Sequence, residues 1–138
     1  MNTIITVAEA VKDALNAGSF SMEFTAQRLY QPHFKLADMG TLHVSVVPSG
    51  VTEDILDRSR TSQDVVIDVA VQQRLATVTV AEIDALMALV GEIGAAFKFL
   101  RLGSAVWTRT ENAPIFAQDH LDQWRQFTSL LRFTFRVV

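Results

Sequence analysis

Hydrophobic and polar residues alternate at a period of two in the middle of the chain. In the segment DVVIDVAVQ (64–72), one face carries only β-branched apolar side chains: Val65, Ile67, Val69 and Val71. The other face is mixed, with aspartate, alanine and glutamine. Because β-branched side chains pack well on a pleated surface, this pattern predicts a half-buried strand. Its second face would meet water or a partner surface.

The period changes to three and four residues directly after this strand. Thr79 and Glu82 have the spacing of a capping box, in which the threonine hydroxyl accepts a hydrogen bond from a free backbone N–H. Apolar side chains then recur at helical spacing: Ile83, Leu86, Val90, Ile93, Phe97 and Leu100. We therefore expect a long helix over 80–100 with its apolar stripe facing the core. A coiled-coil seam is the alternative, although the pattern lasts less than three heptads.

The segment before the central strand predicts one helix and two strands. Residues 6–9 repeat the capping-box spacing, and an apolar stripe follows until Gly18, which would end the helix. Alternating residues predict strands at 20–28 and 42–46. The turn sequence at 48–50, Pro-Ser-Gly, is expected to end the second of these strands.

Less regular segments separate these elements. Residues 29–40 contain a proline and a glycine and are interpreted as a connection. Residues 51–61, VTEDILDRSRT, carry both signs of charge and predict a long hairpin excursion whose inner parts could extend the flanking strands. After the long helix, 106–110 predicts a short strand and 111–114 a turn. Residues 115–126 are compatible with a loop or with one or two helical turns. Alternation over 127–137 predicts a final strand.

The order of elements predicts an α+β fold, helix, three strands, long helix and two strands, with a mostly antiparallel sheet and helices packed on one face. The chain has 138 residues, which suits a single domain over 1–138 with one core. Its hydrophobic fraction of 49% and charged fraction of 20% are typical of a folded globular protein. We find no internal repeat and no linker.

Composition excludes several classes of function. The net charge of −3 argues against a nucleic-acid-binding surface as the main activity. The absence of cysteine excludes disulfides, zinc–thiolate sites and cysteine nucleophiles. No apolar run approaches the roughly 18 residues of a membrane span, and no signal-peptide pattern is present. The mean hydropathy of +0.23 is compatible with apolar surface that is reserved for partners, although a surplus of core residues is the commoner cause.

Candidate chemical groups are sparse. Of the histidines His33, His43 and His120, only the last has a metal-site spacing, with Asp122 two residues later. A non-haem iron triad needs a second histidine further along the chain, and none follows. Three acidic residues could hold a cation, although a solvated loop is the simpler interpretation: Glu53, Asp54 and Asp57. We therefore expect no catalytic, cofactor or metal site.

Five segments form a further pattern over most of the chain: LHVSVVPSG (42–50), the charged loop with Arg58 and Arg60, DVVIDVAVQQRL (64–75), AEIDALMALVGEIGAAF (81–97) and FTSLLRFTFRVV (127–138). A strand ending in V-V-P leads into a charged loop and a V-x-V-x-V strand. A helix with L-x-x-L-x-x-x-I spacing and an F-x-S-x-L strand with an aromatic-rich tail follow. This order resembles the tail-terminator, or tail-completion, proteins of tailed bacteriophages and prophages.

The resemblance implies a structural role in a virion. Such proteins form a ring, usually a hexamer, that caps the finished tail tube and stops its growth. The ring also provides a docking surface for head-completion or neck proteins. The implied partners are therefore further copies of the chain, the tail tube protein and a neck protein, without a membrane, a cofactor or sequence-specific nucleic acid, although DNA can pass through the ring. The implied location is the tail–neck junction, after assembly in the host cytoplasm.

A ring needs two different complementary surfaces on each subunit, and open sheet edges can supply them. We expect the sheet edges and the 51–62 loop to build these contacts. Arg58 and Arg60 would pair with acidic residues of a neighbour, such as Glu53, Asp54 or Asp57. Trp107 and Trp124 are equally compatible with a partner contact and with the core. The alternatives are a small soluble ligand-binding domain or enzyme, and a dimeric bacterial interaction module.

Overall fold

The computed structural model describes residues 3–30, 41–75, 78–112 and 115–138. Its elements follow one another as α1 (Thr3–Ala17), β1 (Ala26–Arg28), β2 (His43–Ile55), β3 (Thr61–Arg74), α2 (Val80–Ala96), β4 (Arg101–Leu102), β5 (Ala105–Glu111), α3 (Gln118–Trp124) and β6 (Gln126–Val137). The predicted α+β class and the predicted order of the principal elements are confirmed.

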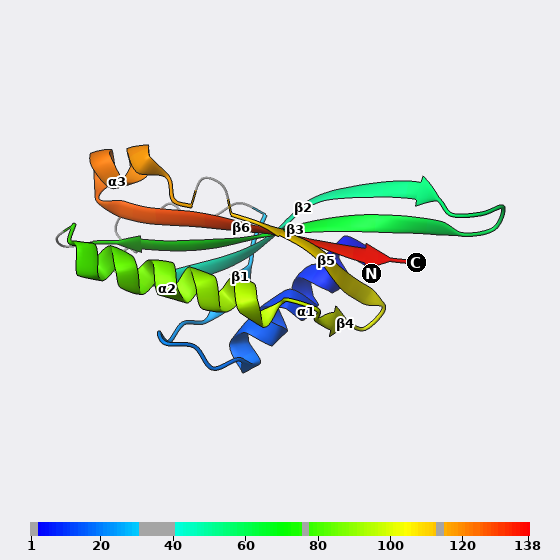
Figure 1. The fold of residues 1–138 in the computed structure, drawn as a ribbon, viewed down its shortest axis with the longest axis horizontal. Coiled ribbons are helices and arrows are strands. Elements are labelled where there is room, and N and C mark those ends of the chain that lie inside the picture. The colour runs from blue at the N-terminus through cyan, green and yellow to red at the C-terminus, as the bar shows by residue number, and fades with distance from the viewer. Residues whose placement is uncertain (1–2, 31–40, 76–77, 113–114) are drawn as a thin grey trace.

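The strands form one sheet in the order β1-β2-β3-β6-β5-β4. The long central strands β3 and β6 pair in antiparallel register from Gln63 opposite Val137 to Arg74 opposite Gln126. Among the described strands, only β1 is parallel to its neighbour, β2. Figure 1 shows these strands drawn out along the long axis of the molecule.

One face of the sheet, together with α1 and α2, encloses a single apolar core. The face consists of the β-branched row predicted on β3 and of the aromatic residues of β6. The ring of Phe97, directly after α2, packs on Phe133 and Phe135 with centroid distances of 4.8 and 6.4 Å. The apolar stripe of α2 therefore faces the core, as its spacing predicts.

The second face of the sheet changes character along its length. Toward one end, cross-strand ion pairs join Arg136 to Asp64 and Arg132 to Asp68, each with a 3.0 Å contact between nitrogen and oxygen. Toward the other end, Ala70 is fully buried. The mixed pattern on this face thus combines a charged, half-solvated surface with a region that the chain itself covers.

The helix boundaries differ from the predicted ones. Helix α1 begins at Thr3, so the capping box predicted at residues 6–9 is wrong. The Glu9 side chain bonds Lys12 and Arg28 instead. At α2, the Thr79 hydroxyl accepts from the Glu82 N–H at 3.2 Å, which confirms the predicted start. The helix ends at Ala96 rather than near residue 100.

Two predicted strand boundaries are also wrong. Only Ala26–Arg28 of the strand expected at 20–28 enters the sheet, because the Ser21 N–H donates to the Glu92 carboxylate of α2 at 2.9 Å rather than to a strand. The turn expected at 48–50 is a β-bulge within β2, which continues to Ile55. A proline is tolerated there because that side of β2 is a sheet edge.

The structure assigns a form to part of the segments for which the sequence predicted no single secondary structure. Part of the ambiguous stretch 115–126 forms α3, which packs on β6 at the left end of the molecule in Figure 1. Strand β4, only two residues long, is an additional element. The connection expected at 29–40, including His33, lies almost entirely outside the described residues.

Candidate assembly surface

The hairpin of β2 and β3 extends beyond the rest of the sheet. Pairing continues from Val51 opposite Val65 to Ile55 opposite Thr61, whereas β6 ends opposite Gln63. Every residue from 51 to 60 is exposed. We call residues 51–61 the arm. Figure 1 shows it at the right end of the molecule, pointing away from the helices.

A compact turn closes the arm. The Asp57 carboxylate accepts from the Ser59 N–H at 2.9 Å and from the Arg60 N–H and Nε at 3.0 and 2.8 Å. The Leu56 N–H donates to the Arg60 carbonyl at 3.0 Å. The hydrogen bond from the Ser59 N–H, reinforced by the Arg60 guanidinium, lowers the pKa of Asp57. The tip is therefore held in one shape by its own aspartate.

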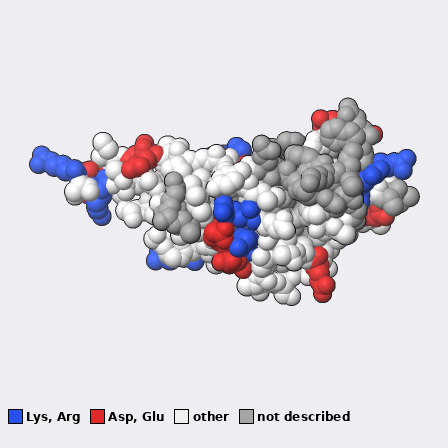
Figure 2. All heavy atoms as spheres, turned by 180° about the vertical axis from the view of Figure 1, so that it is seen from behind, with Lys and Arg blue, Asp and Glu red and all other residues white. Residues whose placement is uncertain are grey.

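All five charged residues predicted to make contacts lie on the arm. Their bonds within the chain differ, however. Asp57 and Arg60 bond each other, and Glu53 accepts from the Gln63 amide at 3.1 Å. Arg58 is exposed and forms no ion pair with any residue that the structure describes. Figure 2 shows basic side chains reaching out at this end, on its left. Arg58 is thus the cation at the tip that is most available to a partner.

The arm also presents apolar side chains, which the sequence reasoning missed. Ile55 is 82% exposed, Leu56 50% and Val51 46%. These residues lie within segment 51–61, which is interpreted from the sequence as a solvated loop because it carries many charged side chains. The signal that could have found two of them is the even spacing of Val51 and Ile55, which places both on one face of a continued strand, with Glu53 between them.

The sheet has open edges on both sides. Strand β1 pairs only with residues 44–46 of β2, so 47–55 has no strand on its outer side within the described ranges. On the opposite edge, β4 covers only residues 105–106 of β5. Open N–H and C=O groups on such edges can pair with another chain. Both edges therefore remain candidates for contacts between subunits.

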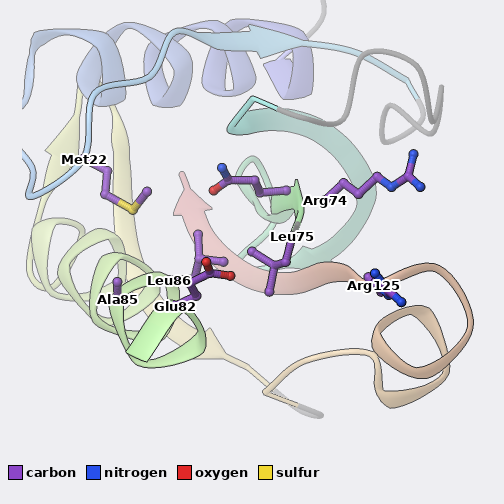
Figure 3. Close-up of a pocket in the computed structure, with 8 residues that line it drawn as sticks. Met22, Arg74, Leu75, Glu82, Ala85, Leu86 and Arg125 are labelled. Carbon is purple, nitrogen blue, oxygen red and sulfur yellow. The ribbon is translucent and has the colours of Figure 1, made fainter. Parts of the chain in front are cut away.

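A hollow of about 560 Å³ lies at the end of the molecule opposite the arm. The end of β3, the first turns of α2 and the segment before β1 contribute its lining: Met22, Gln73, Arg74, Leu75, Glu82, Ala85, Leu86 and Arg125. In Figure 3 the side chains of Met22, Leu75 and Leu86 point into it, whereas the guanidinium groups of Arg74 and Arg125 point away. The hollow is thus mainly apolar inside, with charge at its rim.

The described side chains of His120 and Trp107 form contacts within the chain. The His120 Nδ1 lies 2.9 Å from the Thr128 hydroxyl, and the Gln118 amide donates to Asp122 at 3.0 Å. The Trp107 indole N–H donates to Thr110 at 2.8 Å, and the side chain of Trp124 lies outside the described part. In the described ranges, no three His, Asp or Glu side chains form a possible metal site. No described helix has the length and apolarity needed to cross a bilayer.

Comparison with known proteins identifies a structural neighbour but no sequence relative. No protein family and no curated protein matches the chain. Among solved structures, a chain of the virion of native gene transfer agent (GTA) particle has the same fold, with a TM-score of 0.65 and 18% sequence identity. The match covers 99% of this chain and 98% of that one. The likeness therefore extends over the whole fold.

Proposed function

We propose that the chain is a structural protein of a phage-type virion and acts as its tail terminator. In this role it forms a ring, hexameric as in the family it resembles, which caps the tail tube and ends tail polymerisation. The ring then provides the docking surface for head-completion or neck proteins. The observation that carries the proposal is the whole-length fold match to a chain of a virion particle. The order of segments that resembles tail terminators supports it independently.

The arm and the open edges supply what a ring requires. A closed ring of identical subunits needs a heterologous contact, in which one surface meets a different surface of the next copy. The arm and the two sheet edges offer different surfaces on one subunit. Bound into a neighbour, the exposed apolar residues of the arm would leave water, which favours association.

Light scattering coupled to size exclusion over a wide range of concentrations tests the ring, with negative-stain images of the largest species. We expect closed rings of hexamer size, either in free solution at high concentration or after tail tubes are added. A monomer or dimer at every concentration, unchanged after mixing with tail tubes, would contradict the proposal.

The charged arm residues can be tested separately. We propose that Arg58 and Arg60 face acidic side chains of the neighbouring subunit. The double substitution Arg58→Glu and Arg60→Glu should then shift the assembly equilibrium toward monomers, and circular dichroism should show a folded chain. Rings of unchanged size and concentration dependence in this variant would exclude these arginines from the contact.

A further inference from the structure

We infer that the tip of the arm of one copy inserts into the hollow of a second copy, so that identical subunits join head to tail. This inference rests on the proposed function and specifies one of its contacts. It assigns an occupant to the hollow, which would otherwise be interpreted as a ligand pocket. The occupant is the tip of a neighbour's arm, with Ile55 and Leu56 as the inserted side chains.

The positions of the two surfaces exclude insertion within one chain. Strand β3 begins in the arm at Thr61 and ends at Arg74, on the rim of the hollow. Its 14 residues separate the two sites by about 45 Å at roughly 3.3 Å per residue. Figure 1 shows the two ends on opposite sides of the body. A tip in the hollow must therefore come from another molecule.

The chemistry of the two surfaces is complementary. Ile55 and Leu56 are exposed apolar side chains on a turn that Asp57 already holds in one shape. The hollow offers the partly exposed Met22 and the exposed Ala85, over a floor formed by the buried Leu75 and Leu86. Little ordering of the tip is needed on binding, because the turn is preorganised, and this lowers the entropic cost of association.

Both surfaces also carry charges of both signs, Glu53, Asp54 and Arg58 on the arm and Glu82, Arg74 and Arg125 around the hollow. Arg58 projects from the tip, and the Glu82 carboxylate points toward the hollow in Figure 3. Conversely, the arm carries the acidic side chains of Glu53 and Asp54 behind its tip, and Arg74 lies at the rim of the hollow. Opposite charges at the rim of an apolar contact fix its register and suppress wrong partners.

A pair of introduced cysteines tests this contact directly, because the natural chain has none. We would combine Ile55→Cys at the tip with Ala85→Cys in the lining of the hollow, both at exposed positions. A disulfide needs Cα atoms within about 7 Å, so these residues can bond only between touching copies. We expect mild oxidation to produce a ladder of covalent oligomers on a non-reducing gel.

The matched control combines Ile55→Cys with Ala96→Cys. Ala96 is exposed on the same helix but 11 residues further on, about 16 Å away at 1.5 Å per residue. We expect this variant to remain monomeric on the gel after oxidation. An equal ladder in both variants would mean random collision and would contradict the inference.

Electron microscopy of the wild-type chain, compared with the oxidation ladder of the Ile55→Cys/Ala85→Cys variant, separates this inference from the proposed function. Rings that form without producing the ladder would refute insertion of the tip and leave the terminator role standing. A ladder without rings, even with tail tubes present, would support insertion and contradict the terminator role. Absence of both would contradict both.

Discussion

At the scale of single residues, two phenylalanines close together in the chain have opposite surroundings. Phe97 is 1% exposed and packs against two aromatic rings of β6, whereas Phe99 is 86% exposed with φ of 59°. We expect Phe97→Ala to lower the free energy of unfolding by about 3–5 kcal/mol because it opens a cavity. Phe99→Ala should cost far less. Urea unfolding of both variants measures the difference, and equal losses would contradict the core assignment.

The acidic residue Glu9 should give stability a dependence on pH. Hydrogen bonds from Lys12 and then Arg28 lower its pKa below the ordinary value of 4.5. The Glu9 carboxylate binds a proton more readily in the unfolded chain than in the folded one. The stabilisation from its hydrogen bonds is therefore fully present above pH 4.5 and is lost as pH falls through the lowered pKa. The melting temperature should therefore fall at acid pH, and we call this fall the acid limb of the curve of melting temperature against pH. We expect Glu9→Gln to flatten the acid limb.

The control for this pH effect is Glu23→Gln. Glu23 is exposed and forms no ion pair among the residues described. Thermal melts between pH 2 and 7 should show the wild-type acid limb in this variant and a flatter limb in Glu9→Gln. An identical acid limb in all three proteins would mean that the Glu9 contacts do not stabilise the fold in solution.

At the scale of elements, the cap of α2 offers a quantitative prediction. The Thr79 hydroxyl satisfies one backbone N–H that the first turn leaves without a helical partner. We expect Thr79→Ala to lower the free energy of unfolding by about 1 kcal/mol, and Thr79→Ser to restore most of it. Chemical denaturation measures both, and if the serine variant is no more stable than the alanine variant, the hydroxyl cap does not contribute.

Elements with strong local signals could be predicted from the sequence, and those set by contacts distant in the chain could not. The start of α2 followed from Thr79 and Glu82, because both partners lie within one turn. The apolar alternation at 20–24 gave no strand, since Glu92 of α2 takes the Ser21 N–H. The bulge at 48–50 depends on an open edge, which no local pattern reveals.

In the candidate contact surface, too, residues close together in the chain could be predicted and residues brought together by folding could not. The charged residues of the arm were visible in the sequence as a cluster, so their common location could be expected. The hollow was not, because Met22, Leu75 and Leu86 meet only after three separate elements pack together. Exposure of Ile55 could not be read from its type, since an isoleucine in a strand is more often buried.

At the scale of the whole molecule, the arm should be separable from the fold. Residues 51–60 are all exposed, and β6 ends opposite Gln63, so the core does not depend on the tip. Replacing residues 54–62 by Asn-Gly would close the hairpin between the paired Glu53 and Gln63 with a two-residue turn. We expect this variant to keep the wild-type melting temperature and to lose ring formation.

This prediction joins stability and assembly in one variant. A chain that melts far below the wild type would show that the arm supports the body, and its loss of rings would then say nothing about contacts. A stable chain that still forms closed rings would show that the sheet edges alone hold the subunits together. A stable chain that forms no rings would show that assembly depends on the arm. The apolar side chains of the arm are exposed in the folded chain and would become buried only between subunits.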